Sequence, residues 1–148
     1  MRSRGGFTLM ELLVVLAIAG IVMTMVIPSI SRSMAQTRVQ RAASVVGSDL
    51  QYAYSMAARR RAPVRITVDE ANKVLRVLNY ASPDTTFNER WFSLDGEYPV
   101  QTLESDPATL YVYPNGLASQ DMTITLNAAG QTRVIEMNRA GQVRVSEE

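Results

Sequence analysis

The feature that most constrains this chain is an almost uninterrupted apolar run over residues 7–27, preceded by a short basic stretch with Arg2 and Arg4. As an α-helix, these 21 residues would extend about 31 Å, which is close to the thickness of a bilayer's hydrocarbon core. The one charged side chain in the run is Glu11. The chain is therefore predicted to begin with a membrane helix and to fold its remaining residues outside the bilayer.

Two ordinary interpretations of the apolar run give Glu11 no role. In a secretory signal peptide, Arg2 and Arg4 would form the basic region and residues 17–19 (Ala-Ile-Ala) the small-residue cleavage site, but the run continues well past that point. A plain single-span anchor tolerates a carboxylate near the end of its helix without explaining it. Both interpretations stay open on composition alone.

A third interpretation rests on residues 6–14, which read Gly-Phe-Thr-Leu-Met-Glu-Leu-Leu-Val. This stretch resembles the leader junction of type IV prepilins and type II secretion pseudopilins. The resemblance implies that prepilin peptidase cuts between Gly6 and Phe7 and methylates the new amine of Phe7. It also implies that Glu11 pairs with that amine, in its own chain or in a neighbouring subunit of a filament. The chemistry is coherent, because a carboxylate in apolar surroundings needs a partner.

The composition excludes several kinds of active site. The chain has no Cys and no His, so thiol nucleophiles, disulfides, Cys/His zinc sites and imidazole bases are absent. No catalytic cluster or glycine-rich phosphate loop appears among the remaining polar residues. We therefore predict a protein that is not an enzyme and that uses no cofactor or metal.

Charge is distributed unevenly along the chain. Residues 1–65 carry nine Arg and two acids, a net charge of +7, whereas residues 66–148 carry six basic and twelve acidic residues, a net charge of −6. An acidic C-terminal part is a poor electrostatic match for a phosphate backbone. Nucleic acid is thus not the expected partner.

An amphipathic helix is predicted to continue the apolar run. Pro28 removes a backbone hydrogen bond and predicts a kink there, and the helix is expected to end at about Arg60, before Pro63. Apolar residues expected on its buried face are Ile30, Met34, Ala42, Val46, Leu50, Ala53 and Ala57. Charged residues expected largely on the exposed side are Arg32, Arg38, Arg41 and Asp49.

After Pro63 the apolar period changes to two, which is typical of strands. Strands are predicted at residues 64–69, 73–79, 90–94, 109–113, 122–127, 132–138 and 142–145. The rest of residues 82–107 is predicted to be a loop. The whole is an α+β, pilin-like fold in which a long N-terminal transmembrane and amphipathic helix packs on a small antiparallel β-sheet head. Its parts are a leader (1–6), a transmembrane segment (7–27), the amphipathic continuation (28–62) and the head (63–148).

Two charged clusters have competing interpretations. The acids between residues 84 and 106 (Asp84, Asp95, Glu97, Glu104 and Asp106) are oxygen ligands of the kind calcium prefers. Their spacing matches no ligand loop, so we interpret them as solvated acids. The four arginines at 59, 60, 61 and 65 would suit an anionic partner, but the interpretation we favour is solvated charge near the C-terminal dipole of the helix.

The C-terminal half of the chain indicates which group of pilin-like proteins the sequence resembles. Residues 113–116 (Tyr-Pro-Asn-Gly), the alternating strands and residues 141–145 (Gly-Gln-Val-Arg-Val) resemble the head of the GspH/FimT group of pilin-like proteins. The GspH branch implies a minor pseudopilin of a type II secretion system, a structural subunit of the periplasmic pseudopilus that helps export folded proteins across the outer membrane. The FimT branch implies a minor pilin in pilus assembly or DNA uptake.

The resemblance also implies partners and location. The partners are prepilin peptidase, other pseudopilins or pilins, and the bacterial inner membrane, which the chain would cross once with a cytoplasmic N-terminus and a periplasmic head. DNA-binding members of the FimT branch carry Gly-Arg-x-Arg near the C-terminus, whereas residues 141–144 here lack one of the two arginines. Arg139 and Arg144 remain as the residues that would contact phosphates.

Overall fold

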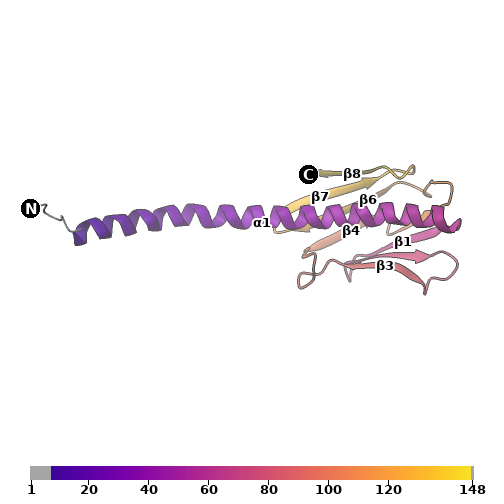
Figure 1. Cartoon of the computed structure of the whole chain (residues 1–148), viewed down its shortest axis with the longest axis horizontal. Helices are drawn as coiled ribbons and strands as arrows, with labels where there is room; N and C mark the ends of the chain where they lie inside the picture. The colour runs from indigo at the N-terminus through magenta and orange to yellow at the C-terminus, as the bar shows by residue number, and fades with distance from the viewer. Residues whose placement is uncertain (1–7, 148) are drawn as a thin grey trace, which may run out of the picture. The chain divides into compact units, whose positions relative to one another are not determined.

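The computed structural model describes residues 8–147, without the side chains of residues 25–32. One helix, α1 (Leu9–Arg60), and eight strands occur in this range, which confirms the predicted α+β class (Figure 1). The strands are β1 (Val64–Asp69), β2 (Val74–Asn79), β3 (Thr86–Trp91), β4 (Thr102–Asp106), β5 (Thr109–Val112), β6 (Met122–Ala128), β7 (Gln131–Met137) and β8 (Val143–Glu147). The chain separates into two compact units, Met1–Met34 and Ala35–Glu148, of which the second is the head.

The first unit contains the start of α1, which is apolar on every side. The large exposed side chains there are Leu9, Met10, Leu12, Leu13, Val14, Val15, Leu16, Ile18, Ile21, Val22 and Met23. A helix that is hydrophobic all round is normally enclosed by lipid or by other apolar surfaces. α1 is continuous through Pro28, where the predicted kink stays a prediction.

Within the described residues, no helix combines the length and the apolar character needed to cross a membrane. The predicted span, residues 7–27, extends beyond the described side chains at both ends.

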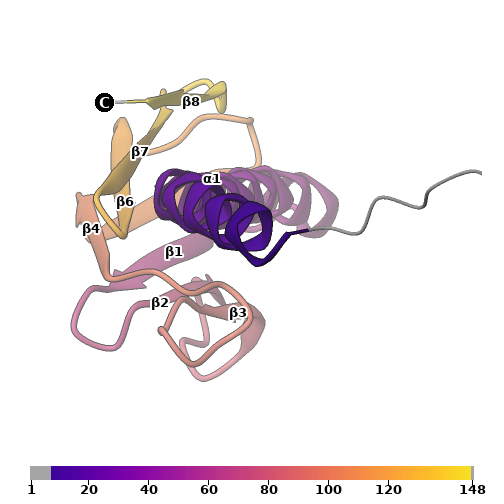
Figure 2. The same ribbon diagram turned by 90° about the vertical axis from the view of Figure 1, so that its left-hand side faces the viewer.

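The head contains two four-stranded antiparallel sheets. Their strand orders are β3-β2-β1-β5 and β4-β6-β7-β8. Figure 2 shows them on two sides of the part of α1 that belongs to the head, with the first sheet below the helix and the second beside it. The part of α1 that lies in the head therefore faces both sheets.

This double contact explains the breadth of the buried face of α1. Fully or almost fully buried positions are Val39, Ala42, Ala43, Val46, Leu50, Ala53 and Ala57, and together with Gly47 and Asp49 they cover about 160° of the helix at 100° per residue. A single apolar stripe needs about 100°. Four of these positions are alanine, and they share one core cluster with the buried side chains of Phe92, Leu110 and Ile124, among others.

Five predicted members of this face are confirmed, namely Ala42, Val46, Leu50, Ala53 and Ala57. The prediction for Met34 is wrong, because its side chain is 54% exposed. At 100° per residue Met34 falls outside the arc that the sheets cover. Ile30 and Arg32 have no described side chains, while Arg38 and Arg41 are exposed as expected.

The prediction for Asp49 is also wrong, since this residue is only 4% exposed. It lies at the margin of the buried face, within hydrogen-bond reach of two side chains of β3. Arg90 donates from Nε to Asp49 Oδ2 over 3.0 Å, and Asn88 donates from Nδ2 to Oδ1 over 2.5 Å. Burial raises the pKa of the Asp49 carboxyl, and the bonds from Arg90 and Asn88 oppose that rise. Through these two hydrogen bonds, Asp49 links the edge strand β3 to α1.

The strand predictions hold within one or two residues except in residues 82–107. The strand predicted at 90–94 runs instead from Thr86 to Trp91 (β3), and β4 lies in a stretch predicted to be loop. Both are edge strands. β3 directs polar side chains to both faces, and β4 buries only Leu103. Neither presents the apolar alternation by which a strand is recognised in sequence.

We expect the stability of the head to depend on pH through Asp49. Its pKa is raised above the ordinary 3.8, so between these two values the folded chain holds a proton that the unfolded chain has released. The stabilisation of the folded head by Asp49 is complete below the pKa of the unfolded state. It is lost as the pH rises through the raised pKa of the folded state.

Asp49→Asn cannot titrate and provides the reference for this test. In urea unfolding of the full-length chain, the free energy of unfolding of wild type minus that of Asp49→Asn should fall as the pH rises above 3.8. A difference that increases with pH would mean that Arg90 and Asn88 outweigh burial.

Candidate functional site

The start of α1 holds its carboxylate in a reciprocal hydrogen-bonded cap. Thr8 precedes the helix, its N–H donates to Glu11 Oε2 over 3.3 Å, and the Glu11 N–H donates to Thr8 Oγ1 over 3.2 Å. This is the capping box, in which two otherwise unpaired helix N–H groups are satisfied. The negative charge also lies at the positive end of the helix dipole.

The Glu11 carboxylate lies where it could pair with a positive charge at the N-terminal end of α1. Glu11 Oε2 is within hydrogen-bond distance of the backbone nitrogen of Thr8, the second residue after the predicted cleavage point. Gly6 and Phe7, the predicted cleavage and methylation residues, lie outside the described residues. The cap itself was not anticipated, although the Thr-x-x-Glu pattern before an apolar run is a known helix-start signal.

A second polar cluster fixes the end of the chain to the head. Arg133 is 6% exposed and donates from Nε to Gln40 Oε1 over 2.9 Å. Its Nη1 lies 2.6 Å from Glu147 Oε1, to which Gln36 also donates. The cluster joins α1, β7 and β8. Sequence analysis missed it, because Arg133 occupies an inward position of a strand where an apolar residue is expected.

The two candidate phosphate-contacting arginines lie on different elements. Arg139 is in the turn between β7 and β8; its N–H donates to Asp121 Oδ1 over 2.7 Å and its Nε to the carbonyl of Ala118 over 3.4 Å. Arg144 is exposed on β8, directly across the ladder from Glu136. Each arginine therefore has an acidic residue beside it, which weakens the local attraction for a phosphate.

The turn that carries Arg139 packs on α1 through Gly141. A side chain there would place its Cβ 2.7 Å from Tyr54 Cε1, and φ is +80°. Both conditions require glycine. The Tyr54 hydroxyl donates to the carbonyls of Asn138 and Arg139, each over 3.5 Å. The backbone conformation and the packing of Tyr54 thus explain why position 141 of this chain is a glycine.

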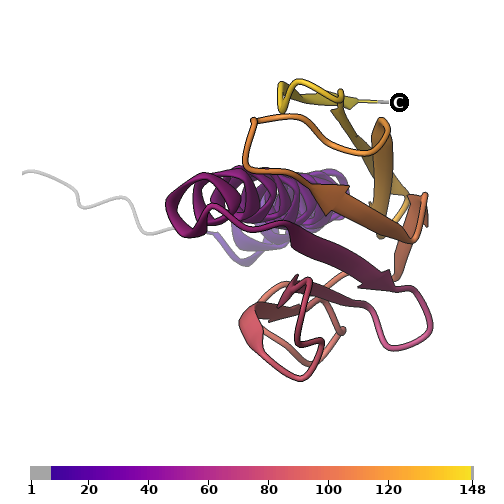
Figure 3. The same ribbon diagram turned by 90° about the vertical axis from the view of Figure 1, so that its right-hand side faces the viewer.

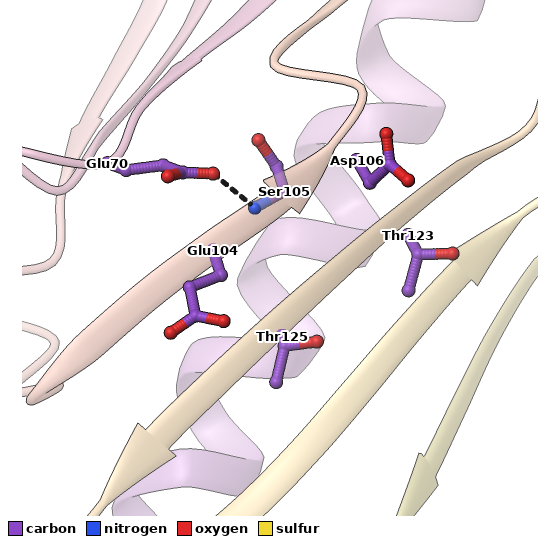
Figure 4. Close-up of a pocket in the computed structure, with 6 residues that line it drawn as sticks. All are labelled: Glu70, Glu104, Ser105, Asp106, Thr123 and Thr125. Carbon is purple, nitrogen blue, oxygen red and sulfur yellow. Dashed lines mark hydrogen bonds between the residues drawn. The ribbon is translucent and has the colours of Figure 1, made fainter.

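The acids of residues 82–107 do not converge. Glu104 and Asp106 project from the edge strand β4 beside Thr125 and Thr123 of β6, where Figure 4 shows them lining an open hollow of about 370 Å³. Glu70 lies at its rim and accepts the Ser105 N–H over 2.8 Å. In the described part of the chain, no group of three or more Asp or Glu side chains is placed to hold a metal ion.

Comparison with known families gives two matches. The prokaryotic N-terminal methylation motif matches residues 1–27, and the type II transport protein GspH matches residues 42–141. None of the curated proteins matches the sequence.

Solved structures of pilin-like proteins have a similar fold. The type IV minor pilin FimU of Pseudomonas aeruginosa is 22% identical, with a TM-score of 0.60 over 75% of this chain and 90% of that one. The minor pseudopilin EpsH of the Vibrio cholerae type 2 secretion system is 13% identical, with a TM-score of 0.57 over 74% of this chain and 97% of that one. At these identities the likeness shows the fold alone.

Proposed function

Since the chain belongs to the GspH family of type II transport proteins, we propose that it is a minor pseudopilin, a structural subunit of the periplasmic pseudopilus of a type II secretion system. In this role it helps export folded proteins across the outer membrane. The observation that carries the proposal is the start of α1, which is apolar on every side and begins with a capped carboxylate. The role is structural and requires neither a catalytic group nor a cofactor.

The exposed apolar helix needs an apolar environment at each stage of this role. Before assembly, lipid of the inner membrane would surround residues 7–27, with the leader in the cytoplasm and the head in the periplasm. After assembly, the helices of neighbouring subunits would cover the same side chains. Both environments remove apolar area from water, at about 25 cal/mol per Å².

Glu11 has a specific task in this scheme. Prepilin peptidase would remove residues 1–6, and the methylated amine of Phe7 would then carry a positive charge close to the capped carboxylate. In a membrane or filament interior an unpaired carboxylate is strongly disfavoured. Pairing with the amine of the same chain or of a neighbour would draw a subunit into register.

We expect Glu11→Gln to separate capping from charge pairing. Glutamine at this position can keep the reciprocal cap with Thr8, but it has no charge for the amine of Phe7. The variant should be cleaved normally and be incorporated into the filament about tenfold less than wild type, as measured by crosslinking to neighbouring subunits in cells and immunoblotting.

Thr8→Ala is the matched control, because it removes the threonine half of the cap and keeps the carboxylate. Its cost should be only about 1 kcal/mol of helix stability, and its incorporation should stay near that of wild type. Normal incorporation of Glu11→Gln together with poor incorporation of Thr8→Ala would show that Glu11 acts as a cap and not as a charge partner.

Deletion of the gene should abolish release of secreted proteins into the medium, and a wild-type copy should restore it whereas Glu11→Ala should not. The measurement is the protein profile of the culture medium, with pilus-dependent surface motility and DNA uptake recorded in the same strains. Normal release combined with loss of motility or DNA uptake would reject the secretion role in favour of the minor-pilin role.

A further inference from the structure

Four arginines gather at the corner where α1 ends and β1 begins. Arg59 and Arg60 lie in the last helical turn, Arg61 follows it, and Arg65 is the second residue of β1. Figure 3 looks onto this end of the helix and shows β1 leaving beside it. Attraction to the helix dipole accounts for positive charge here, but it does not supply bonding partners for the guanidinium groups.

These guanidinium groups lack the partners that other arginines of the head possess. Within the described residues, the side chains of Arg59, Arg61 and Arg65 form no hydrogen bond and no ion pair. By contrast, the head's ion pairs engage Arg76, Arg90 and Arg133. Acidic residues thus neutralise Arg76, Arg90 and Arg133, whereas the arginines at this corner keep an uncompensated positive charge.

Arg61 occupies a backbone position that favours glycine. Its φ is +52°, the left-handed conformation in which helices commonly end with glycine. For a residue with a Cβ this conformation costs about 1 kcal/mol or more. Glycine at this position would relieve the backbone, so Arg61→Gly removes the guanidinium without straining the end of the helix.

Arg65 lies on the outer face of the first sheet among aromatic rings. Its Cα partner on β5 is Tyr111, whose ring meets that of Tyr80 edge-on with 5.6 Å between centroids. The Nε of Arg65 is buried and has no hydrogen-bond partner among the described residues. A carboxylate from outside can therefore reach this guanidinium only through its Nη atoms, with which it would form charge-assisted hydrogen bonds.

The rest of the corner has the composition of a protein-binding surface. The Arg60 guanidinium stacks 4.3 Å from the centroid of Phe87, Tyr80 is 53% exposed and Tyr113 is 40% exposed. Arginine and tyrosine are the residues most enriched among the energetically important contacts of protein interfaces. Tyrosine offers a large contact area with only two side-chain torsions to immobilise.

We propose that this arginine corner, defined as Arg59, Arg61 and Arg65 with Tyr80 and Tyr111, binds a carboxylate-rich surface of a partner protein. The proposal deepens the proposed function, on which it rests, by giving the head a contact within the secretion machinery. A protein is favoured over nucleic acid because residues 66–148 carry a net charge of −6. A compact basic corner can meet a small acidic patch, whereas the acidic remainder of the head would repel an extended polyanion.

The test uses the full-length chain in a nonionic detergent and a short fluorescein-labelled peptide that alternates Glu and Ser. Fluorescence anisotropy should show binding that weakens with salt. Replacing both Arg59→Ala and Arg61→Ala should weaken binding about tenfold or more. The matched control, Arg38→Ala with Arg41→Ala, removes the same amount of charge from an earlier part of α1 and should change the affinity by less than about twofold.

Arg61→Gly distinguishes binding from folding. It relieves the left-handed backbone, so its thermal unfolding midpoint should equal or exceed that of wild type, while peptide affinity should fall about fivefold. Absence of peptide binding at low salt, or equal losses in the two double variants, would overturn the proposal. Tighter binding of a single-stranded oligonucleotide through the same arginines would replace it with a nucleic-acid site.

The binding result and the secretion result are independent readouts. Peptide binding at the corner with normal secretion in the deletion strain would reject the proposed function and keep the site. Loss of secretion in the deletion strain without any peptide binding would reject the site and keep the function.

Discussion

One face of α1 must serve two sheets at the same time, and the architecture of the head depends on this contact. Hydrophobic burial is non-directional, so a second sheet can be accommodated only if the helix offers a wider buried arc and small side chains. Ala42 and Ala43 lie toward opposite margins of that arc, and Ala53 and Ala57 continue it toward the C-terminus. Leu50 supplies the bulk at the centre. Larger residues at the alanine positions would separate the sheets from the helix, since cores tolerate little overpacking.

Directional polar contacts define the two margins of this arc. Asp49 binds Arg90 and Asn88 on the side of the first sheet, and Gln40 binds Arg133 on the side of the second. Buried polar groups of this kind contribute little net stability when they are paired, but they are expensive to leave unpaired. They therefore penalise a sheet that slides along the helix, a movement that apolar contacts alone would resist weakly.

Elements with one dominant physical signal could be predicted from the sequence. Residues on which two tendencies compete could not. The central strands alternate apolar and polar residues, and the helix ends before Pro63, so both could be predicted. Asp49 and Arg133 were misjudged or missed because charge ordinarily means exposure, and their partners come from distant parts of the chain. β4 was missed because an edge strand with one buried residue has no period to detect. At the start of α1, the family resemblance singled out Glu11, whereas the pattern of residues 8–11 alone would have indicated only a cap.

The cap at the start of α1 bears on how processing would be linked to assembly under the proposed function. In the unprocessed chain the nitrogen of Phe7 is an uncharged amide, and the carboxylate of Glu11 has the Thr8 N–H as its described donor. Cleavage would convert that amide into an amine one residue from the cap without any change in the rest of the helix. The carboxylate would then gain a charged donor, and charge-assisted bonds are roughly twice as strong as neutral ones. Only processed subunits would therefore have Glu11 fully satisfied in an apolar filament interior, so the same carboxylate that begins the helix would also select the subunits that are ready to assemble.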